Sequence, residues 1–140
     1  MKIDSANQSD TIYIVAGNEM KKLMKQKYPE RKTIAFREDF SQGNHCCFSF
    51  SPELISERAL YWNVSESEYI ENTAQIINLD ITLKYILCFG NDECCRANLE
   101  FMICYLKHKG YSQNIKVQIV DEYTLEVNEE YDIINPKNDI

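Results

Sequence analysis

Short apolar runs alternate along this chain with segments whose apolar side chains recur at helical spacing. Residues 11–16, TIYIVA, form one such run, which stops at a Gly-Asn pair. Residues 83–89, LKYILCF, form another, which stops at Gly-Asn-Asp. Apolar runs of this length that end in turn residues are typical of buried strands. Because a helical pattern follows each run, the sequence predicts strand–turn–helix units and a layered α/β domain with a mainly parallel sheet.

Capping residues indicate where several helices begin. Residues 51–53, Ser-Pro-Glu, supply a serine N-cap, a proline at the first helical position and an acid in the first turn. Ser65 and Glu68 have the spacing of a capping box, and Asp92 is a suitable N-cap after the strand at 83–89. The patterns predict helices at 19–27, 52–62, 65–79 and 93–109, and further strands at 32–36, 115–120 and 123–127.

The order of these elements predicts a single α/β domain of three layers. A chain of 140 residues has the usual length of one domain. We expect residues 11–127 to form this domain around a mainly parallel central sheet, with the last two strands as a C-terminal antiparallel edge hairpin. Residues 1–10 are expected to be a disordered N-terminal tail, and residues 128–140 an acidic C-terminal tail.

The chain is acidic, with a formal net charge of −7. This charge should repel nucleic acid and anionic membrane surfaces, and it could steer a basic protein partner. The alternative is that the acidic residues only keep the protein soluble. Residues 1–10 lack the apolar core of a signal peptide, and no apolar run approaches a membrane span. We therefore expect a cytoplasmic protein with reduced thiols and no membrane partner.

The cysteines do not have the spacing of a metal site. They lie at positions 46, 47, 88, 94, 95 and 104. Zinc ligands usually stand two to four residues apart, whereas this set contains two adjacent pairs and no C-x-x-C motif. We expect no metal and no cofactor; the alternative is a site assembled in space from His45 and the adjacent pairs. Cys94 and Cys95 fall in the first turn of a helix, where a lowered thiol pKa is the alternative to simple packing.

Three polar turns follow three predicted strands, and in a parallel sheet they share the carboxyl edge, where open α/β sheets bind ligands. Arg58 follows the second turn and could contact an anion, and Asn98 could bond a strand end or line a pocket. The candidate ligand-binding residues are Gly17, Asn18, Asp39, Gly43, Arg58, Gly90, Asp92, Cys95 and Asn98. The chain contains no G-x-G-x-x-G, P-loop or H-E-x-x-H motif, and no catalytic residue is predicted.

Several short motifs stand in a specific order along the chain: IYIVAGN (12–18), FREDFSQG (36–43), RALYW (58–62) with Tyr69, and ILCFGND (86–92) with Cys95 and Asn98. Together they resemble the bacterial domain-of-unknown-function family eighteen-thirty-five, over roughly residues 12–110. The role of that family is not established, so the resemblance implies a fold rather than a reaction.

The chain departs from the pattern of that family at three positions. Family members commonly carry Asp where this chain has Asn18, Pro where it has Asn44, and Trp where it has Cys88. Many members also carry a further C-terminal domain. If the family is enzymatic, Asn18 replaces a carboxylate that acid–base or metal chemistry would need.

Two functions of different classes remain open from the sequence. The first is a protein-binding domain without catalysis, of the immunity or antitoxin type, whose partner is a basic protein such as a toxin. The second is an enzyme or small-ligand-binding domain that uses Asp39, Arg58, Asp92 and Asn98 at the carboxyl edge, with Cys95 as a possible nucleophile. A metal–thiolate protein is a third interpretation.

Overall fold

The computed structural model describes residues 11–80, 82–110 and 115–133, and within these ranges five strands and four helices follow one another. They are β1 (Thr11–Val15), α2 (Asn18–Lys27), β2 (Lys32–Ala35), α3 (Pro52–Trp62), α4 (Glu66–Ile77), β3 (Lys84–Phe89), α5 (Glu93–His108), β4 (Ile115–Val120) and β5 (Val127–Asp132). The predicted tail at 1–10 and the end of the predicted acidic tail, 134–140, lie outside the described residues.

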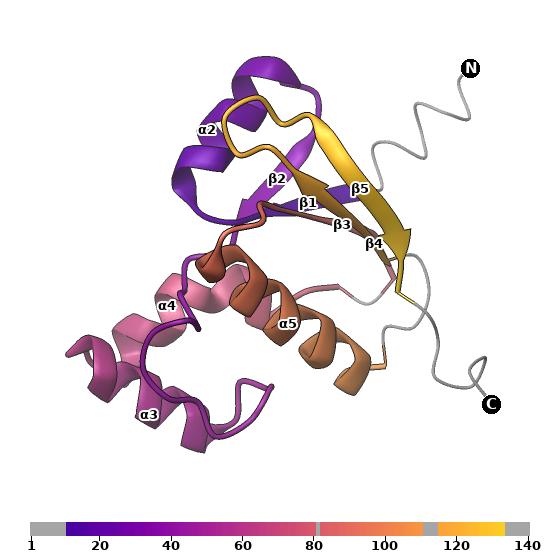
Figure 1. The fold of residues 1–140 in the computed structure, drawn as a ribbon. Coiled ribbons are helices and arrows are strands. Elements are labelled where there is room, and N and C mark those ends of the chain that lie inside the picture. The colour runs from indigo at the N-terminus through magenta and orange to yellow at the C-terminus, as the bar shows by residue number, and fades with distance from the viewer. Residues whose placement is uncertain (1–10, 81, 111–114, 134–140) are drawn as a thin grey trace.

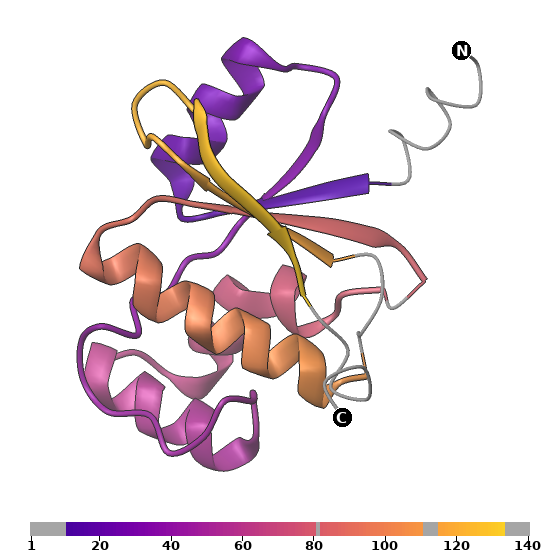
Figure 2. The same cartoon turned by 45° about the vertical axis from the view of Figure 1, so that its right-hand side comes forward.

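The five strands form one sheet in the order β2-β1-β3-β4-β5. The pairs β1–β2, β1–β3 and β3–β4 are parallel, and the edge pair β4–β5 is antiparallel. Helix α2 covers one face of the sheet, and α3, α4 and α5 lie on the other face (Figures 1 and 2). This arrangement confirms the predicted α/β fold with a mainly parallel sheet and an antiparallel edge hairpin.

Neighbouring residues in the central strands pack into two different cores. Ile14 and Leu87 belong to the large core under α3, α4 and α5, whereas Val15 and Cys88 belong to the smaller core under α2. Successive side chains of a strand point to opposite faces, so a sheet covered on both faces needs continuous apolar runs. Burial also raises the pKa of the Cys88 thiol to about 11, so Cys88 packs as a small apolar residue.

The three predicted N-caps are confirmed. The Ser51 hydroxyl accepts a hydrogen bond from the backbone N–H of Leu54 at 3.2 Å, at the start of α3. The Ser65 hydroxyl accepts from the N–H of Glu68 at 3.0 Å, at the start of α4. Asp92 caps α5 in the same way (2.7 Å). These caps fix where each helix leaves its loop, and therefore where its first turn faces the sheet.

The C-terminal hairpin lies further along the chain than the sequence predicts. The Asp121 carboxylate accepts hydrogen bonds from the N–H groups of Tyr123 and Thr124, at 2.8 and 3.0 Å, and so holds the segment after β4 in a turn. The strand predicted at 123–127 is therefore wrong. Residues 128–132, predicted as the start of an acidic tail, instead belong to β5 and pair with β4.

Within the described part of the chain, no helix combines the length and apolar character needed to cross a membrane.

Candidate functional site

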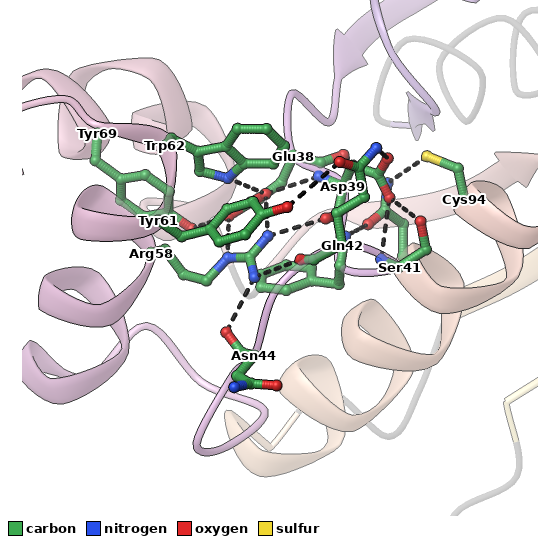
Figure 3. Close-up of polar contacts among 12 residues, drawn as sticks. Glu38, Asp39, Ser41, Gln42, Asn44, Arg58, Tyr61, Trp62, Tyr69 and Cys94 are labelled. Atoms are coloured by element: carbon green, nitrogen blue, oxygen red, sulfur yellow. Dashed lines mark hydrogen bonds and ion pairs between the residues drawn. The ribbon is translucent and has the colours of Figure 1, made fainter.

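Arg58 on α3 is fully buried and binds the loop that follows β2. Its Nε and Nη2 atoms donate to the two carboxylate oxygens of Glu38, each at 2.8 Å. Its remaining N–H groups donate to the backbone carbonyls of Asp39, Gln42 and Asn44 at 2.8–3.0 Å (Figure 3). All five guanidinium donors are therefore occupied. The anion that Arg58 contacts is therefore a carboxylate of its own chain, and the role of Arg58 is to hold the loop after β2.

Glu38 accepts further hydrogen bonds in addition to the two from Arg58. Its carboxylate also accepts from the indole N–H of Trp62 at 2.9 Å, the hydroxyl of Tyr69 at 2.6 Å and the N–H of Asp39 at 2.7 Å. Burial acts to raise the pKa of Glu38, but the hydrogen bonds from Arg58 and Tyr69 outweigh it and lower that pKa. Burial first, and then the bond to Glu38, raise the pKa of Tyr69, which keeps its proton.

Aromatic rings surround the buried ion pair. The guanidinium carbon of Arg58 lies 4.7 Å from the centre of the Phe40 ring, 5.3 Å from that of Tyr61 and 5.6 Å from that of Trp62. Gly43 lets the loop pass under Tyr61, because a Cβ atom at this position would lie 2.7 Å from the Tyr61 ring. The predicted residue Gly43 is thus required for close packing against α3.

Asn98 on α5 attaches the same loop to the large core. Its side-chain oxygen accepts a hydrogen bond from the N–H of Phe40 at 2.9 Å, and its amide nitrogen donates to the carbonyl of Glu38 at 2.7 Å. Asn98 is almost completely buried. Asn98 therefore bonds the loop after β2, beyond the strand end at Ala35, and is not among the lining residues of the two pockets described below.

A pocket of about 340 Å³ opens beside this cluster, at the carboxyl ends of β1 and β2. Its lining residues come from both strand ends, from the end of α3 and from α4: Ala16, Gly17, Phe36, Arg37, Glu38, Asp39, Trp62, Val64, Tyr69, Asn72 and Thr73. We call it the α4 pocket. Of the sequence-predicted residues it brings together Gly17 and Asp39.

A second pocket, of about 650 Å³, lies on the α2 side of the sheet, and we call it the α2 pocket. It is lined by residues after β1, of α2, of the turn after β3 with the start of α5, and of the turn after β4: Ala16, Glu19, Met20, Lys22, Leu23, Gln26, Asp92, Cys94, Cys95, Glu122 and Tyr123. Asp92 and Cys95 line this pocket, and Asp39, which lines the α4 pocket, contacts Cys94 of the α2 pocket, so the two pockets adjoin at the carboxyl edge of the sheet. Asn18 is the first residue of α2 and is exposed.

Two carboxyl groups meet at the rim of the α2 pocket. Hydrogen bonding to Asp92, followed by burial, raises the pKa of Glu122. The backbone N–H of Cys95 lowers the pKa of Asp92, so Glu122 takes up a proton first as the pH falls. Gly90 passes close to this pair, since a Cβ atom there would lie 3.2 Å from a Glu122 carboxylate oxygen.

The thiols at the start of α5 are not activated. Burial raises the pKa of both Cys94 and Cys95 to about 12, and the neighbouring carboxylates of Asp39 and Asp92 add to the shift. Burial and negative charge therefore outweigh the helix N-terminus that could have lowered these pKa values. Both groups remain protonated thiols at neutral pH. In the described ranges, no His, Cys, Asp and Glu side chains are grouped so as to hold a metal ion.

Three residues of the buried cluster are not among the candidates that the sequence predicts: Glu38, Trp62 and Tyr69. All three stand in motifs that carry the family resemblance, FREDF, RALYW and the tyrosine that follows. Their position in these motifs was the one sequence feature that could have indicated them. Local sequence patterns alone do not distinguish Glu38 from a charged loop residue that faces solvent.

The sequence matches no model of a known protein family, no curated protein and no solved structure. The resemblance to family eighteen-thirty-five stays a prediction from the residues quoted above.

Proposed function

We propose that this chain is a protein-binding domain without catalysis, and that α3 and α4 form the face that receives a basic partner. The observation that carries this proposal is a group of exposed apolar side chains on these two helices. Leu60 is 83 % exposed, Tyr61 45 %, Trp62 37 % and Ile70 43 %. Aromatic and aliphatic side chains in this state are the usual anchors of protein interfaces.

Charge defines the chemistry of the partner. The glutamates of α3 and α4 are Glu53, Glu57, Glu66, Glu68 and Glu71, and the basic residue of these helices, Arg58, is neutralised by Glu38. Helix α2, across the sheet, instead carries lysines at 21, 22, 25 and 27. A basic protein approaching this molecule is therefore attracted to the α3–α4 side, which supports a basic partner such as a toxin.

The α4 pocket supplies a place for an anchoring side chain. Trp62 and Tyr69 line it, and its volume of about 340 Å³ suits one large apolar side chain. Glu66 precedes Tyr69 by three residues and Glu68 precedes Asn72 by four, so both glutamates stand next to the pocket on the helix surface. This combination favours a partner segment that inserts an apolar residue between lysines or arginines.

The side chains that an enzyme would use are engaged elsewhere or not reactive, which supports a proposal without catalysis. Arg58 and Glu38 are committed to one another. The raised pKa of Cys95 leaves this residue protonated and a poor nucleophile.

The test is capture of the tagged chain from its own cells, followed by native mass spectrometry and zero-length carbodiimide cross-linking. We expect a stoichiometric complex with a basic protein whose lysines cross-link to Glu66, Glu68 or Glu71. Failure to retain any stoichiometric protein, or cross-links confined to other faces, would overturn the proposal.

Two matched pairs of variants locate the face. E66K/E68K/E71K should lose the partner, whereas E100K/E126K/E129K changes the net charge equally at exposed positions elsewhere and should keep it. Leu60→Ala should weaken binding, and Tyr123→Ala, at a side chain 82 % exposed, should not. Equal effects of the two charge variants would indicate a general charge effect without a defined face.

The α2 pocket supports a second candidate function, small-ligand binding. It lies between the carboxyl ends of β1 and β3, where the connections of the sheet diverge in opposite directions, and open α/β sheets bind ligands at this point. In this case the native mass spectrum would show a small added mass on the lone chain, and Glu122→Gln would remove it. Asp92→Ala is a poorer probe, because losing the N-cap alone costs about 1 kcal/mol.

A further inference from the structure

The adjacent cysteines of the loop before α3 form a close thiol pair. The sulfur atoms of Cys46 and Cys47 lie 3.5 Å apart, and Cys46 is exposed while Cys47 is partly exposed. Cys47 also lies 3.4 Å from the hydroxyl oxygen of Ser51, the N-cap of α3. Neither thiol belongs to the face or the pockets described above.

We propose that Cys46 and Cys47 are a redox-active pair that a hydroperoxide converts reversibly into a vicinal disulfide. The Cys47 thiolate attacks one peroxide oxygen, the O–O bond breaks, and the other oxygen leaves as an alcohol or water after taking up a proton. Cys47 is then a sulfenic acid. The Cys46 thiol attacks the Cys47 sulfur, forms the S–S bond and expels water. Overall, the two thiols lose two electrons and two protons, and the peroxide is reduced.

The surroundings distinguish an attacking thiol from a resolving thiol. The Ser51 hydroxyl already accepts from the N–H of Leu54, so its own proton is free to point at the Cys47 sulfur. The hydrogen bond from Ser51 lowers the pKa of Cys47 even against the effect of burial. The hydrogen bond to Cys47 raises the pKa of Cys46 to about 11. Cys47 therefore ionises before Cys46, which makes Cys47 the attacking thiol and Cys46 the resolving thiol.

Geometry makes the product reducible. Adjacent residues have Cα atoms about 3.8 Å apart, which is shorter than the usual span of a disulfide, and such strained bonds have more oxidising potentials. Cys88, Cys94 and Cys95 are poor competitors, since burial raises the pKa of each. Cys104 on α5 is partly exposed and has to be followed in the same peptide map. The pair thus has the properties of a reversible switch and not of a structural cross-link.

Oxidation would act on the loop that holds Arg58. The N–H of Cys46 donates to the Glu57 carboxylate at 2.7 Å, and the carbonyl of Asn44, two residues earlier, accepts from Arg58. Forming the S–S bond must close the 3.5 Å gap between the two sulfur atoms, one of which contacts Ser51 at the start of α3. The start of α3 is therefore the element whose hydrogen exchange should change on oxidation.

The test treats the reduced full-length protein with a stoichiometric amount of hydrogen peroxide, alkylates the remaining thiols and maps the peptides. In the wild type we expect one peptide in which Cys46 and Cys47 both escape alkylation, with a mass lower by two hydrogens. Dithiothreitol should restore both alkylation sites. Recovery of both cysteines alkylated after peroxide treatment, or an intermolecular disulfide in their place, would overturn the proposal.

Single variants separate the two roles. Cys46→Ser should stop at the sulfenic acid of Cys47, which dimedone traps, with little change in the rate of peroxide consumption. Cys47→Ser should lower that rate by about tenfold or more, because the contact with the Ser51 hydroxyl that favours ionisation is made by Cys47. Cys94→Ser is the control and should behave as the wild type. Equal rates in Cys46→Ser and Cys47→Ser would contradict the assignment, and circular dichroism establishes that each variant is folded.

Discussion

Glu38 is the single residue on which the polar contacts behind the α4 pocket converge. It accepts from Arg58, Trp62, Tyr69 and the N–H of Asp39, so its carboxylate joins the loop after β2 to both α3 and α4. A buried ion pair adds little net stability compared with an apolar pair, but removing one partner leaves a buried charge without compensation. The cluster is therefore sensitive to any change at either of its charged members.

We predict that Glu38→Gln lowers the free energy of unfolding by about 3–5 kcal/mol. The amide keeps the shape of the side chain, so the loss reports the uncompensated guanidinium of Arg58. Urea denaturation measures it, and Glu68→Gln, at an exposed position, is the control with an expected change of less than about 0.5 kcal/mol. A small loss in Glu38→Gln would mean that the loop opens to solvate Arg58.

The stabilisation from Glu38 should also depend on pH. Its pKa is lowered in the folded protein, so this stabilisation is complete above the unfolded pKa of glutamate, about 4.3, and is lost as the pH falls through the lower folded value. The difference in unfolding free energy between the wild type and Glu38→Gln should therefore shrink on acidification below that point. A difference that stays constant with pH would contradict the charged state of Glu38.

Gly43 is a second residue whose identity is required by its surroundings, since the Tyr61 ring leaves no room for a Cβ atom. We predict that Gly43→Ala destabilises the protein more than Gly110→Ala does. Both glycines have positive φ, +71° and +91°, which costs an L residue about 1–2 kcal/mol, but only at Gly43 would the new Cβ meet the Tyr61 ring. Thermal denaturation of the two variants separates the steric contact from the backbone strain, and equal losses would show that Tyr61 moves aside freely.

At the scale of elements, sequence patterns predict a helix or strand correctly where its buried residues recur along the chain at a regular spacing. β1 and β3 contribute buried residues to the cores on both faces of the sheet and appear as apolar runs, and α3, α4 and α5 begin at the predicted caps. β5 has every residue exposed, so its sequence, VNEEYD, shows no apolar alternation. Pairing with β4, a non-local interaction, makes it a strand, and single-sequence patterns do not contain that information.

The role of the turn between β4 and β5 can be tested by substitution of Asp121. We predict that Asp121→Ala lowers the free energy of unfolding by about 1 kcal/mol, because the N–H groups of Tyr123 and Thr124 lose their common acceptor. Hydrogen exchange should speed up along β4 and β5 before it does so in β1. Asp121→Asn keeps an acceptor oxygen and should recover most of the stability. Uniform acceleration across the whole sheet would contradict a local role for this turn.

At the scale of the whole molecule, the candidate site depended on contacts that join distant parts of the chain. The sequence predicts Arg58 and Asn98 as site residues, but their roles follow from Glu38 and Phe40, which lie 20 and 58 positions away from them, respectively. No local pattern specifies such pairings. The sequence therefore indicates the carboxyl edge of the sheet. The presence of two pockets there, and the engagement of every Arg58 donor within the chain, follow from the tertiary structure.

Asn98 connects the two halves of the molecule, since α5 belongs to the β3–β4 side and Phe40 to the loop after β2. We predict that Asn98→Ala lowers the free energy of unfolding by about 2–4 kcal/mol, because it leaves the buried N–H of Phe40 and the carbonyl of Glu38 without their partner. The Phe40 amide should then exchange much faster with solvent, whereas amides in the centre of β3 should change only with global stability. Asn98→Asp retains the acceptor for Phe40 but loses the donor to Glu38, so it should protect the Phe40 amide better than alanine does. Fast exchange of Phe40 in both variants would show that the loop is held by Arg58 alone and that α5 only packs against it.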